Sequence, residues 1–84
     1  MTEQLIGTVS DFFAKPVVAG IELTGDLYEG DIIHIVGHTT DLEMVAKSMQ
    51  INNQAVTEAH RGEAVGLEVT DRVRHGDKVY KIEK

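Results

Sequence analysis

Three glycine-acid steps limit what this chain can fold into more than any other feature. They are Gly30-Asp31, Gly62-Glu63 and Gly76-Asp77, and each opens into a run rich in valine, isoleucine and leucine. Glycine adopts a positive φ at a turn without a steric penalty, and β-branched residues favour a pleated strand. We interpret the three acids as turn residues rather than catalytic or metal-binding groups, because the same pattern recurs wherever a strand begins. The steps therefore predict a chain built from strands.

Apolar and polar residues alternate with period two along the chain, whereas helical spacing extends over only a few residues. The alternation predicts strands at 5–13, 17–23, 31–36 and 42–51, a very short strand at 55–56, and strands after Gly62 and Gly76. Pro16 ends the first strand, and a bulge near Lys47 or Ser48 joins the two halves of the fourth. A helix over 42–51 is the alternative. About seven strands with glycine turns between them predict a small antiparallel barrel or sandwich, and closure into a barrel would hide the strand edges.

The length of 84 residues predicts a single domain over residues 1–84, with a core at about 5–82. The chain has no cysteine, and hence neither a disulfide framework nor a thiolate metal site. The amino terminus lacks a basic region followed by an apolar stretch, and no apolar run approaches the roughly 20 residues needed to cross a bilayer. We expect a cytoplasmic protein without a membrane partner.

The net charge is −6, yet basic residues are concentrated after Asp71. Such a chain repels polyanions in general while offering one small basic strip, so neither DNA binding nor non-specific nucleic-acid binding is expected. The candidate contacts for a protein partner or an RNA are Lys47, Arg72, Arg74, His75, Lys78 and Lys81. The alternative for the strip after Asp71 is a solvated outer strand face, with Val73 packed inward.

Four histidines raise the question of metal binding, and His34 and His38 have an H-x-x-x-H spacing. On a helix this spacing would bring both rings to one face, but we expect His34 in a strand and His38 in the following turn. The chain has neither a phosphate-binding loop nor a G-x-S-x-G elbow. We therefore expect no metal, no cofactor and no enzymatic activity.

Two further features concern the strand surfaces. Phe12 and Phe13 are adjacent, so they must point to opposite faces of a regular strand, and one of them is expected to be partly exposed. An exposed phenylalanine could stack on a base or anchor a protein partner, and packing under the loop at 14–16 is the alternative that we favour. Gly7 and Gly66 lie inside predicted strands, where glycine indicates a bend or a close backbone approach.

Five blocks of sequence follow one another along nearly the whole chain. They are Ile6-Gly7-Thr8-Val9, residues 27–37 around Gly30-Asp31, Lys47-Ser48-Met49-Gln50-Ile51, residues 59–67 around Gly62-Glu63, and residues 73–79 around Gly76-Asp77. In this order the blocks resemble the second domain of translational GTPases such as elongation factor Tu. The resemblance implies a small closed antiparallel Greek-key β-barrel of that type. Similar barrels also occur as accessory domains in initiation factors and in some collagenase-like peptidases.

The resemblance implies a non-catalytic binding module that docks on the ribosome, a transfer RNA or a translation factor. The family's second domain helps to hold the aminoacyl end of transfer RNA through an arginine and an acidic residue, and these positions read Thr8 and Lys47 here. The alternative function is a protein-interaction or accessory barrel that serves as a separate subunit of a larger enzyme or complex. The acidic segment up to Asp71 and the two departures favour that alternative.

Overall fold

The computed structural model describes residues 2–15 and 17–83, and every regular element in this part of the chain is a β-strand. The strands are β1 (Thr2–Ala14), β2 (Val17–Leu23), β3 (Leu27–Tyr28), β4 (Ile32–Val36), β5 (Asp41–Val45), β6 (Met49–Ile51), β7 (Gln54–Val56), β8 (Glu58–Ala59), β9 (Ala64–Glu68) and β10 (Lys78–Glu83). All of their pairings are antiparallel. The predicted all-β antiparallel class is confirmed, and residues 42–51 form no helix.

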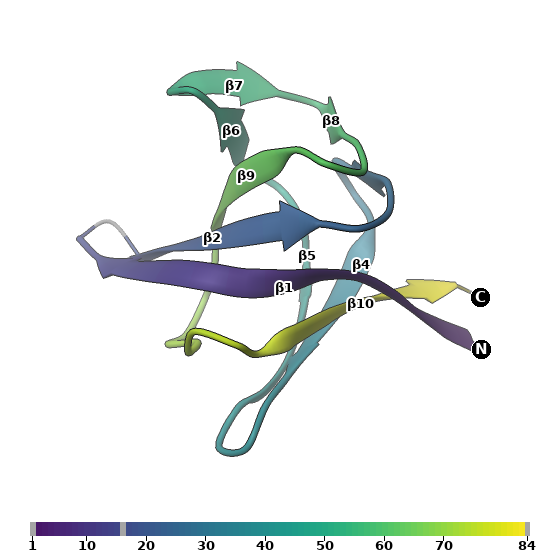
Figure 1. The fold of residues 1–84 in the computed structure, drawn as a ribbon, viewed down its shortest axis with the longest axis vertical. Coiled ribbons are helices and arrows are strands. Elements are labelled where there is room, and N and C mark those ends of the chain that lie inside the picture. Colours follow the sequence, from purple (N-terminus) through teal and green to yellow (C-terminus); the bar gives the residue numbers. More distant parts are fainter. Residues whose placement is uncertain (1, 16, 84) are drawn as a thin grey trace.

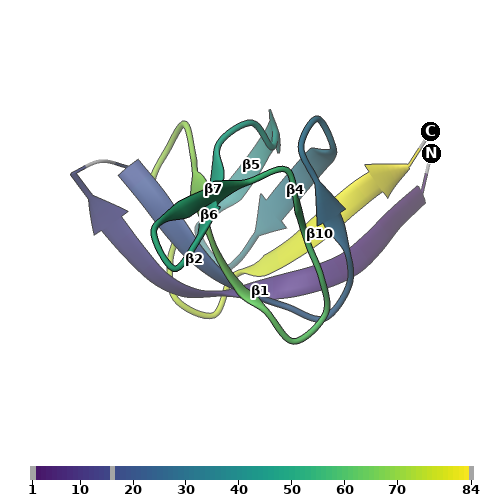
Figure 2. The ribbon, with the colours of Figure 1, turned by 90° about the horizontal axis from the view of Figure 1, so that it is seen from above.

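Eight strands form one sheet in the order β5-β4-β10-β1-β2-β9-β6-β7, while β3 pairs with β8 separately. The large sheet curls around the core, so that β4 and β5 lie on the side opposite β1 and β2 (Figures 1 and 2). The long strand β1 pairs with β10 on one edge and with β2 on the other. Its register shifts between Leu5 and Gly7 and again between Val9 and Asp11. Such bulges bend a strand and increase its twist, which helps β1 to serve both sides of the curled sheet.

The predicted closure into a Greek-key barrel is not found. Among the residues that the structure describes, β5 and β7 stand at the two ends of the sheet and do not pair with each other. The reason lies in the connection between β5 and β6. Ala46 donates a backbone hydrogen bond to Asp31 at 2.8 Å and accepts one from Gly30 at 2.7 Å, so this segment pairs with a turn. For the same reason, the single bulged strand predicted over 42–51 is two strands, β5 and β6.

Alternate residues of the long strands point into one core. In β4, for example, Ile33 and Ile35 are fully buried, and His34 between them faces outward. The buried apolar residues are Ile6, Val9, Ala19, Ile21, Leu23, Leu27, Ile33, Ile35, Ala46, Met49, Ala59, Val65, Leu67, Val69, Val73 and Val79. Because side chains alternate with period two, the core also determines which residues the same strands present to the outside.

The three glycine-acid steps form three turns of one design. Gly30, Gly62 and Gly76 have φ values of +97°, +89° and +93°, which suit the third position of a type II turn. The backbone N–H of each acid donates to the carbonyl three residues earlier, at 3.0 Å in every case. The carboxylate of the acid accepts a hydrogen bond from the backbone N–H of that same earlier residue. These donors are Tyr28, His60 and Arg74, at 2.9, 2.7 and 2.8 Å.

Each turn also binds the backbone of a residue that is distant in the sequence. The glycine N–H donates to the distant carbonyl, and the carbonyl of the acid accepts from the distant N–H, with distances between 2.7 and 3.0 Å. The distant residues are Ala46, Leu23 and Val9, for the turns at Gly30, Gly62 and Gly76 in that order. The turns therefore begin strands and also attach them to other strands.

The strands β3 and β8 were not predicted. Each has two residues, which is too short for a period-two pattern to show. Pro16, predicted to end the first strand, lies outside the described residues, although β1 does end at Ala14. Over residues 2–15 and 17–83, no helix is long and apolar enough to cross a membrane.

Candidate functional site

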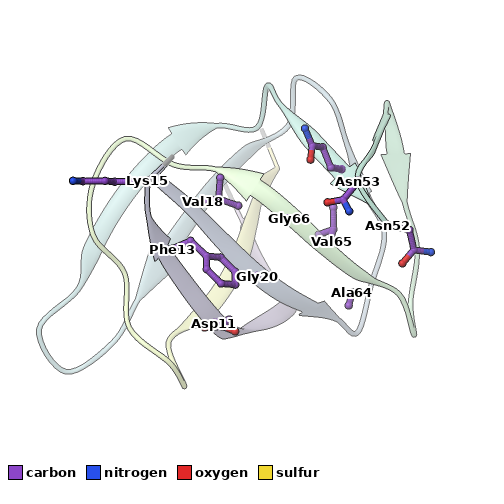
Figure 3. Close-up of a pocket in the computed structure, with 11 residues that line it drawn as sticks. Asp11, Phe13, Lys15, Val18, Gly20, Asn52, Asn53, Ala64, Val65 and Gly66 are labelled. Carbon is purple, nitrogen blue, oxygen red and sulfur yellow. The ribbon is translucent and has the colours of Figure 1, made fainter.

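An open groove with a volume of about 570 Å³ lies on the outer face of β1, β2, β9 and β6 (Figure 3). Its floor follows one row of residues across the four strands. Asp11 pairs with Gly20, Gly20 pairs with Gly66, and Gly66 pairs with Gln50. Since the two central positions are glycines, the middle of the floor consists of backbone.

Phe13 and Val18 form the next row of the groove, because they pair with each other across β1 and β2. Phe13 is 53% exposed, whereas its neighbour Phe12 packs against the core. In Figure 3 the Phe13 ring lies near Gly20 and Lys15 extends away from the floor. The phenylalanine that sequence reasoning expected to be exposed is therefore Phe13, and it lines the groove.

Asn52 and Asn53 line the opposite side of the groove. They form the two-residue turn between β6 and β7, where Ile51 pairs with Gln54. Both have a positive φ, at 54° and 63°, as a type I′ hairpin turn requires, and asparagine tolerates this conformation well. The hairpin thereby holds two amide side chains at the edge of the groove.

Sequence reasoning did not find this groove. Its floor comes from four strands that are adjacent in the sheet, and only β1 and β2 are also adjacent in the sequence. The available signal was glycine inside a strand: Gly66 was recognised as a possible site of close backbone approach, and Gly20 was not. Only the structure shows that these two glycines pair with each other across β2 and β9.

The six predicted partner contacts lie in several parts of the fold. Arg72 lies over the ring of Phe12, with 5.9 Å between its guanidinium carbon and the ring centroid. Arg74 and His75 occupy the first two positions of the third turn. Lys47 lines a separate cavity of about 180 Å³, together with Ser48 and Glu68 among others. A partner contact at any of these residues stays a prediction.

The side chains of Lys78 and Lys81 lie on opposite faces of β10. Val79 points into the core, so its neighbour Lys78 points outward. Lys81 lies two residues after Val79 and therefore on the same inward face of the strand, and its side chain is only 16% exposed. The Lys81 Nζ atom is 3.7 Å from the Asp31 carboxylate and 5.5 Å from the centroid of the Tyr28 ring. Lys81 is thus partly neutralised within the protein.

His60 lies beside Tyr28, with the ring centroids 6.0 Å apart in an edge-to-face arrangement. Its Nδ1 atom is 3.0 Å from the Asp26 carboxylate and its Nε2 atom is 3.6 Å from Glu58. The hydrogen bond with Asp26 is the main cause that raises the pKa of His60. The charge of Asp26 is also the main cause that raises the pKa of Tyr28.

His34 connects three strands on the outer face of the sheet. Its Nε2 atom is 2.5 Å from Asp41 of β5, and its Nδ1 atom is 3.0 Å from Glu3 of β1. The hydrogen bond with Asp41 is the main cause that raises the pKa of His34, and partial burial of the ring opposes it. Within the described residues, no group of three or more histidine and carboxylate side chains is placed to hold a metal ion.

Comparison with known proteins relates the chain to proteases. It is 49% identical over 80 residues to an uncharacterized protease of Methanocaldococcus jannaschii, with 94% of this chain and 20% of the protease covered. It is 33% identical over 82 residues to a collagenase of Porphyromonas gingivalis, with 94% of this chain and 22% of the collagenase covered. The chain thus spans about a fifth of the length of these curated relatives.

A crystal structure with the same fold is the C-terminal domain of a Geobacillus thermoleovorans protein assigned to the U32 peptidases. The TM-score is 0.88 at 14% sequence identity, with 95% of this chain and 93% of that domain covered. A selenomethionine variant of the same domain gives a TM-score of 0.85. No family model matches the chain.

These comparisons correct the resemblance to translational GTPases. The relatives are named as a protease and a collagenase, and the structural neighbour is a U32 peptidase domain rather than the second domain of an elongation factor. The predicted docking on the ribosome, a transfer RNA or a translation factor is therefore wrong. The five blocks misled because they consist mainly of turn and strand residues, which describe how strands begin and do not identify a partner.

Proposed function

We propose that this chain is an accessory, non-catalytic β-domain of a U32 peptidase-type protein, either within a longer polypeptide or as a separately supplied subunit. The observation that carries the proposal is the 49% identity to the Methanocaldococcus jannaschii protease across 94% of this chain. The matched segment is 20% of that protease, which leaves most of its length for a catalytic part. The same fold in a domain that was crystallised separately supports an accessory unit.

The contacts of the histidines support a non-catalytic role. In the part of the chain that the structure describes, the side-chain hydrogen bonds and ion pairs of His34 and His60 are all with carboxylates. Neither ring is paired with a serine or threonine hydroxyl, as the general base of a hydroxyl nucleophile would be. Among the described residues, the lining of the groove likewise includes no serine, threonine or cysteine that could act as a nucleophile.

An apolar outer face on β5, β4, β10 and β1 supports a docked position in a larger protein. Leu5 is 46% exposed and Val45 is 38% exposed. Across the sheet, Leu5 pairs with Tyr80, while Val45 connects through Ile32 to Ile82. Exposed apolar patches commonly mark contact surfaces.

Acidic residues also lie on this apolar outer face. Glu3 and Asp41 lie on it through their contacts with His34, and Glu43 pairs directly with His34. Lys78 is the basic residue on the same face of β10. We therefore expect the occupant to be the peptidase-type part, presenting apolar groups together with lysine or arginine.

Immunoprecipitation from the source cells tests the proposal. An antibody against this chain is expected to recover it within, or together with, a polypeptide several times its length, identified by mass spectrometry as a U32 peptidase. Nuclease treatment should leave that recovery unchanged. Recovery without such a polypeptide, or recovery only of ribosomal proteins in an RNA-dependent manner, would overturn the proposal.

Substitutions on the apolar outer face test the docked position. In a tagged copy of the chain, Leu5→Glu combined with Val45→Glu is expected to reduce recovery of the peptidase-type polypeptide at least threefold. Val17→Glu is the matched control, because Val17 is similarly exposed, at 37%, at the start of β2. Equal losses in the double variant and the control would rule out this face as the contact surface.

A further inference from the structure

The strand β5 has one edge that no other strand occupies in the described part of the chain. It pairs with β4 alone, at one end of the large sheet. Gly37 and Thr40, in the turn that joins the two strands, exchange both backbone hydrogen bonds. Hydrogen-bonded and non-hydrogen-bonded pairs alternate along an antiparallel ladder, so every second residue from Asp41 points its backbone groups away from β4. These outward N–H and C=O groups belong to Asp41, Glu43 and Val45.

The core is incompletely covered along the same edge. Leu42 and Met44 lie on the inner side of β5 and pack against the core, yet they stay partly exposed. Their partners on β4, Ile35 and Ile33, are fully buried. At the Val45 end, the edge borders a cavity of about 180 Å³. A strand added along β5 would therefore gain backbone hydrogen bonds and apolar contacts together.

The outer side of this edge is acidic. Asp41 and Glu43 are exposed there, next to Val45. Pairing with β5 of a second copy in full antiparallel register would place Glu43 opposite Glu43, and like charges that face each other destabilise a sheet. Lysine or arginine at the facing positions would instead stabilise the pairing. The edge thus favours a basic strand over another copy of this chain.

Both ends of the described chain lie near this edge. Thr2 pairs with Glu83, so the two ends are side by side (Figures 1 and 2). From β10 the sheet continues through β4 to β5, and these two strand spacings amount to about 10 Å. The matched segment is only 20% of the Methanocaldococcus jannaschii protease. A peptidase-type part joined at either end would therefore start close to β5.

We propose that a strand of the peptidase-type part adds to the open edge of β5. Its alternate residues are apolar, toward Leu42 and Met44, and lysine or arginine, toward Asp41 and Glu43. Since β5 has five residues, a partner strand of similar length can use all three outward positions. The apolar outer face continues onto β5 through Val45, so one partner can cover both surfaces. The inference rests on the proposed accessory function and specifies how the two parts meet.

Hydrogen exchange tests the added strand. Deuterium uptake, resolved to single amides by mass spectrometry, is compared between the isolated chain and the same chain in the recovered peptidase-type polypeptide. The amides of Glu43 and Val45 are expected to exchange at least about tenfold more slowly in the assembled protein, because strand pairing protects them. The strand β7, at the other end of the sheet, is the internal control. Unchanged uptake in β5, or equal added protection of β5 and β7, would overturn the inference.

Proline at one outward position tests the same edge by substitution. Glu43→Pro removes an outward N–H and keeps the backbone groups that bond to β4, so in a tagged copy it is expected to reduce recovery of the peptidase-type polypeptide at least about threefold. Ala55→Pro is the matched control. Ile51 and Gln54 close the two-residue turn between β6 and β7, so the N–H of Ala55 also points outward, but from β7. The control should leave recovery unchanged.

Charge reversal provides a second variant in case proline perturbs folding. Asp41→Lys combined with Glu43→Lys keeps every backbone N–H and is expected to reduce recovery at least about threefold through repulsion of a basic strand. Glu22→Lys combined with Glu58→Lys makes the same change of charge on β2 and β8 and should not reduce it. If these two double variants recover equal amounts, the inference is wrong.

The outcomes separate this inference from the proposed function. If the unaltered chain is recovered without a peptidase-type polypeptide, the accessory function itself fails. If that polypeptide is recovered equally well with the unaltered chain and with the β5 variants, only the added strand is refuted. Recovery of a second copy of the chain, lost with Glu43→Pro, would assign the edge to self-pairing instead.

Discussion

Two glycines of this fold differ sharply in what their missing side chains permit. A Cβ atom at Gly37, just after β4, would overlap the carboxylate of Asp77. That carboxylate is held in place, because it accepts a hydrogen bond from the Arg74 N–H and Asp77 is only 5% exposed. A Cβ atom at Gly66 would meet only ordinary contacts. Glycine is therefore a packing requirement at one position and an open surface at the other.

Substitution by alanine should separate the two positions. Gly37→Ala is expected to lower the free energy of unfolding by about 1–3 kcal/mol, as overpacking in a filled site does. Gly66→Ala is expected to be neutral or to stabilise by up to about 1 kcal/mol, because alanine fits a strand better than glycine. Urea denaturation measures both. In an Asp77→Ala background the cost of Gly37→Ala should shrink, and strict additivity would show that Asp77 is not the obstacle.

The pairing of His34 with Asp41 and Glu3 predicts a pH-dependent stability. The folded-state pKa of His34 is raised, mainly by the hydrogen bond with Asp41. Because the pKa of His34 is higher in the folded than in the unfolded chain, its protonation stabilises the fold. This stabilisation is complete at pH values below the unfolded-state pKa of about 6.5, and it is lost as the pH rises through the folded-state pKa. The difference in unfolding free energy between the unaltered chain and His34→Gln should therefore be largest near pH 5–6 and should fall at higher pH.

Salt and a second histidine provide the controls for this effect. The side chains of Glu3 and Asp41 are 44% and 83% exposed, so the pH-dependent difference should decrease in about 0.5 M salt, where surface charges are screened. His38→Gln alters a histidine that takes part in neither ion pair and is the control substitution. Stability of His34→Gln that parallels the unaltered chain at every pH would refute the assignment.

At the scale of elements, the three turns share one hydrogen-bonding scheme but differ in burial. Asp77 is buried, whereas Glu63 is exposed. Water can replace the carboxylate of Glu63, but it has little access to that of Asp77. The same contact should consequently matter more in the third turn than in the second.

Alanine substitution of the two acids measures this difference. Asp77→Ala is expected to cost about 1–3 kcal/mol, because the Arg74 N–H loses its carboxylate partner in a partly buried site. Glu63→Ala is expected to cost less than about 1 kcal/mol, although it removes the equivalent bond to His60. Thermal denaturation followed by circular dichroism compares them. Equal costs would show that burial of the acid does not determine the strength of the turn.

For the whole molecule, the order of the sheet predicts where the fold opens first. The strand β1 lies between β10 and β2, while β5 and β7 stand at the ends of the sheet. Amides in core strands usually exchange only through large-scale opening, and those at the ends exchange through local opening. Amides of β1 bonded to β2 or β10 should exchange with deuterium most slowly and those of β7 fastest. Uniform exchange across the sheet would contradict this picture.

Sequence reasoning predicted the strands better than their arrangement. The strand over 17–23 and the short strand near 55–56 follow from alternation and turn residues, and they are present as β2 and β7. Alternation also indicates the inward face of a strand. Because Lys81 lies two residues after the apolar Val79, its inward position could have been inferred from the sequence. It does not indicate which strands become neighbours. The bond between Ala46 and the turn at Gly30, which prevents β5 and β6 from continuing one ladder, left no local signal.

The groove shows the same limit. Asp11, Gly20, Gly66 and Gln50 are adjacent only because of the order β1-β2-β9-β6. One sequence records that Gly66 is unusual inside a strand, but not what lies on either side of it. The partner could not be predicted either, because turn and strand patterns are shared by many unrelated proteins.

The glycine-acid turns also bear on how the chain rejects mispaired sheets while it folds. Sheets that join strands distant in sequence form slowly, and a slip of one residue turns the core side chains of a strand toward water. Each turn takes both backbone groups of one distant residue, Val9, Leu23 or Ala46. In a strand slipped by one residue, the backbone N–H and C=O facing the turn would point away from it, and both bonds would be lost together. The three turns thus tie these strands to one register through backbone hydrogen bonds, in addition to the constraint that the core side chains impose.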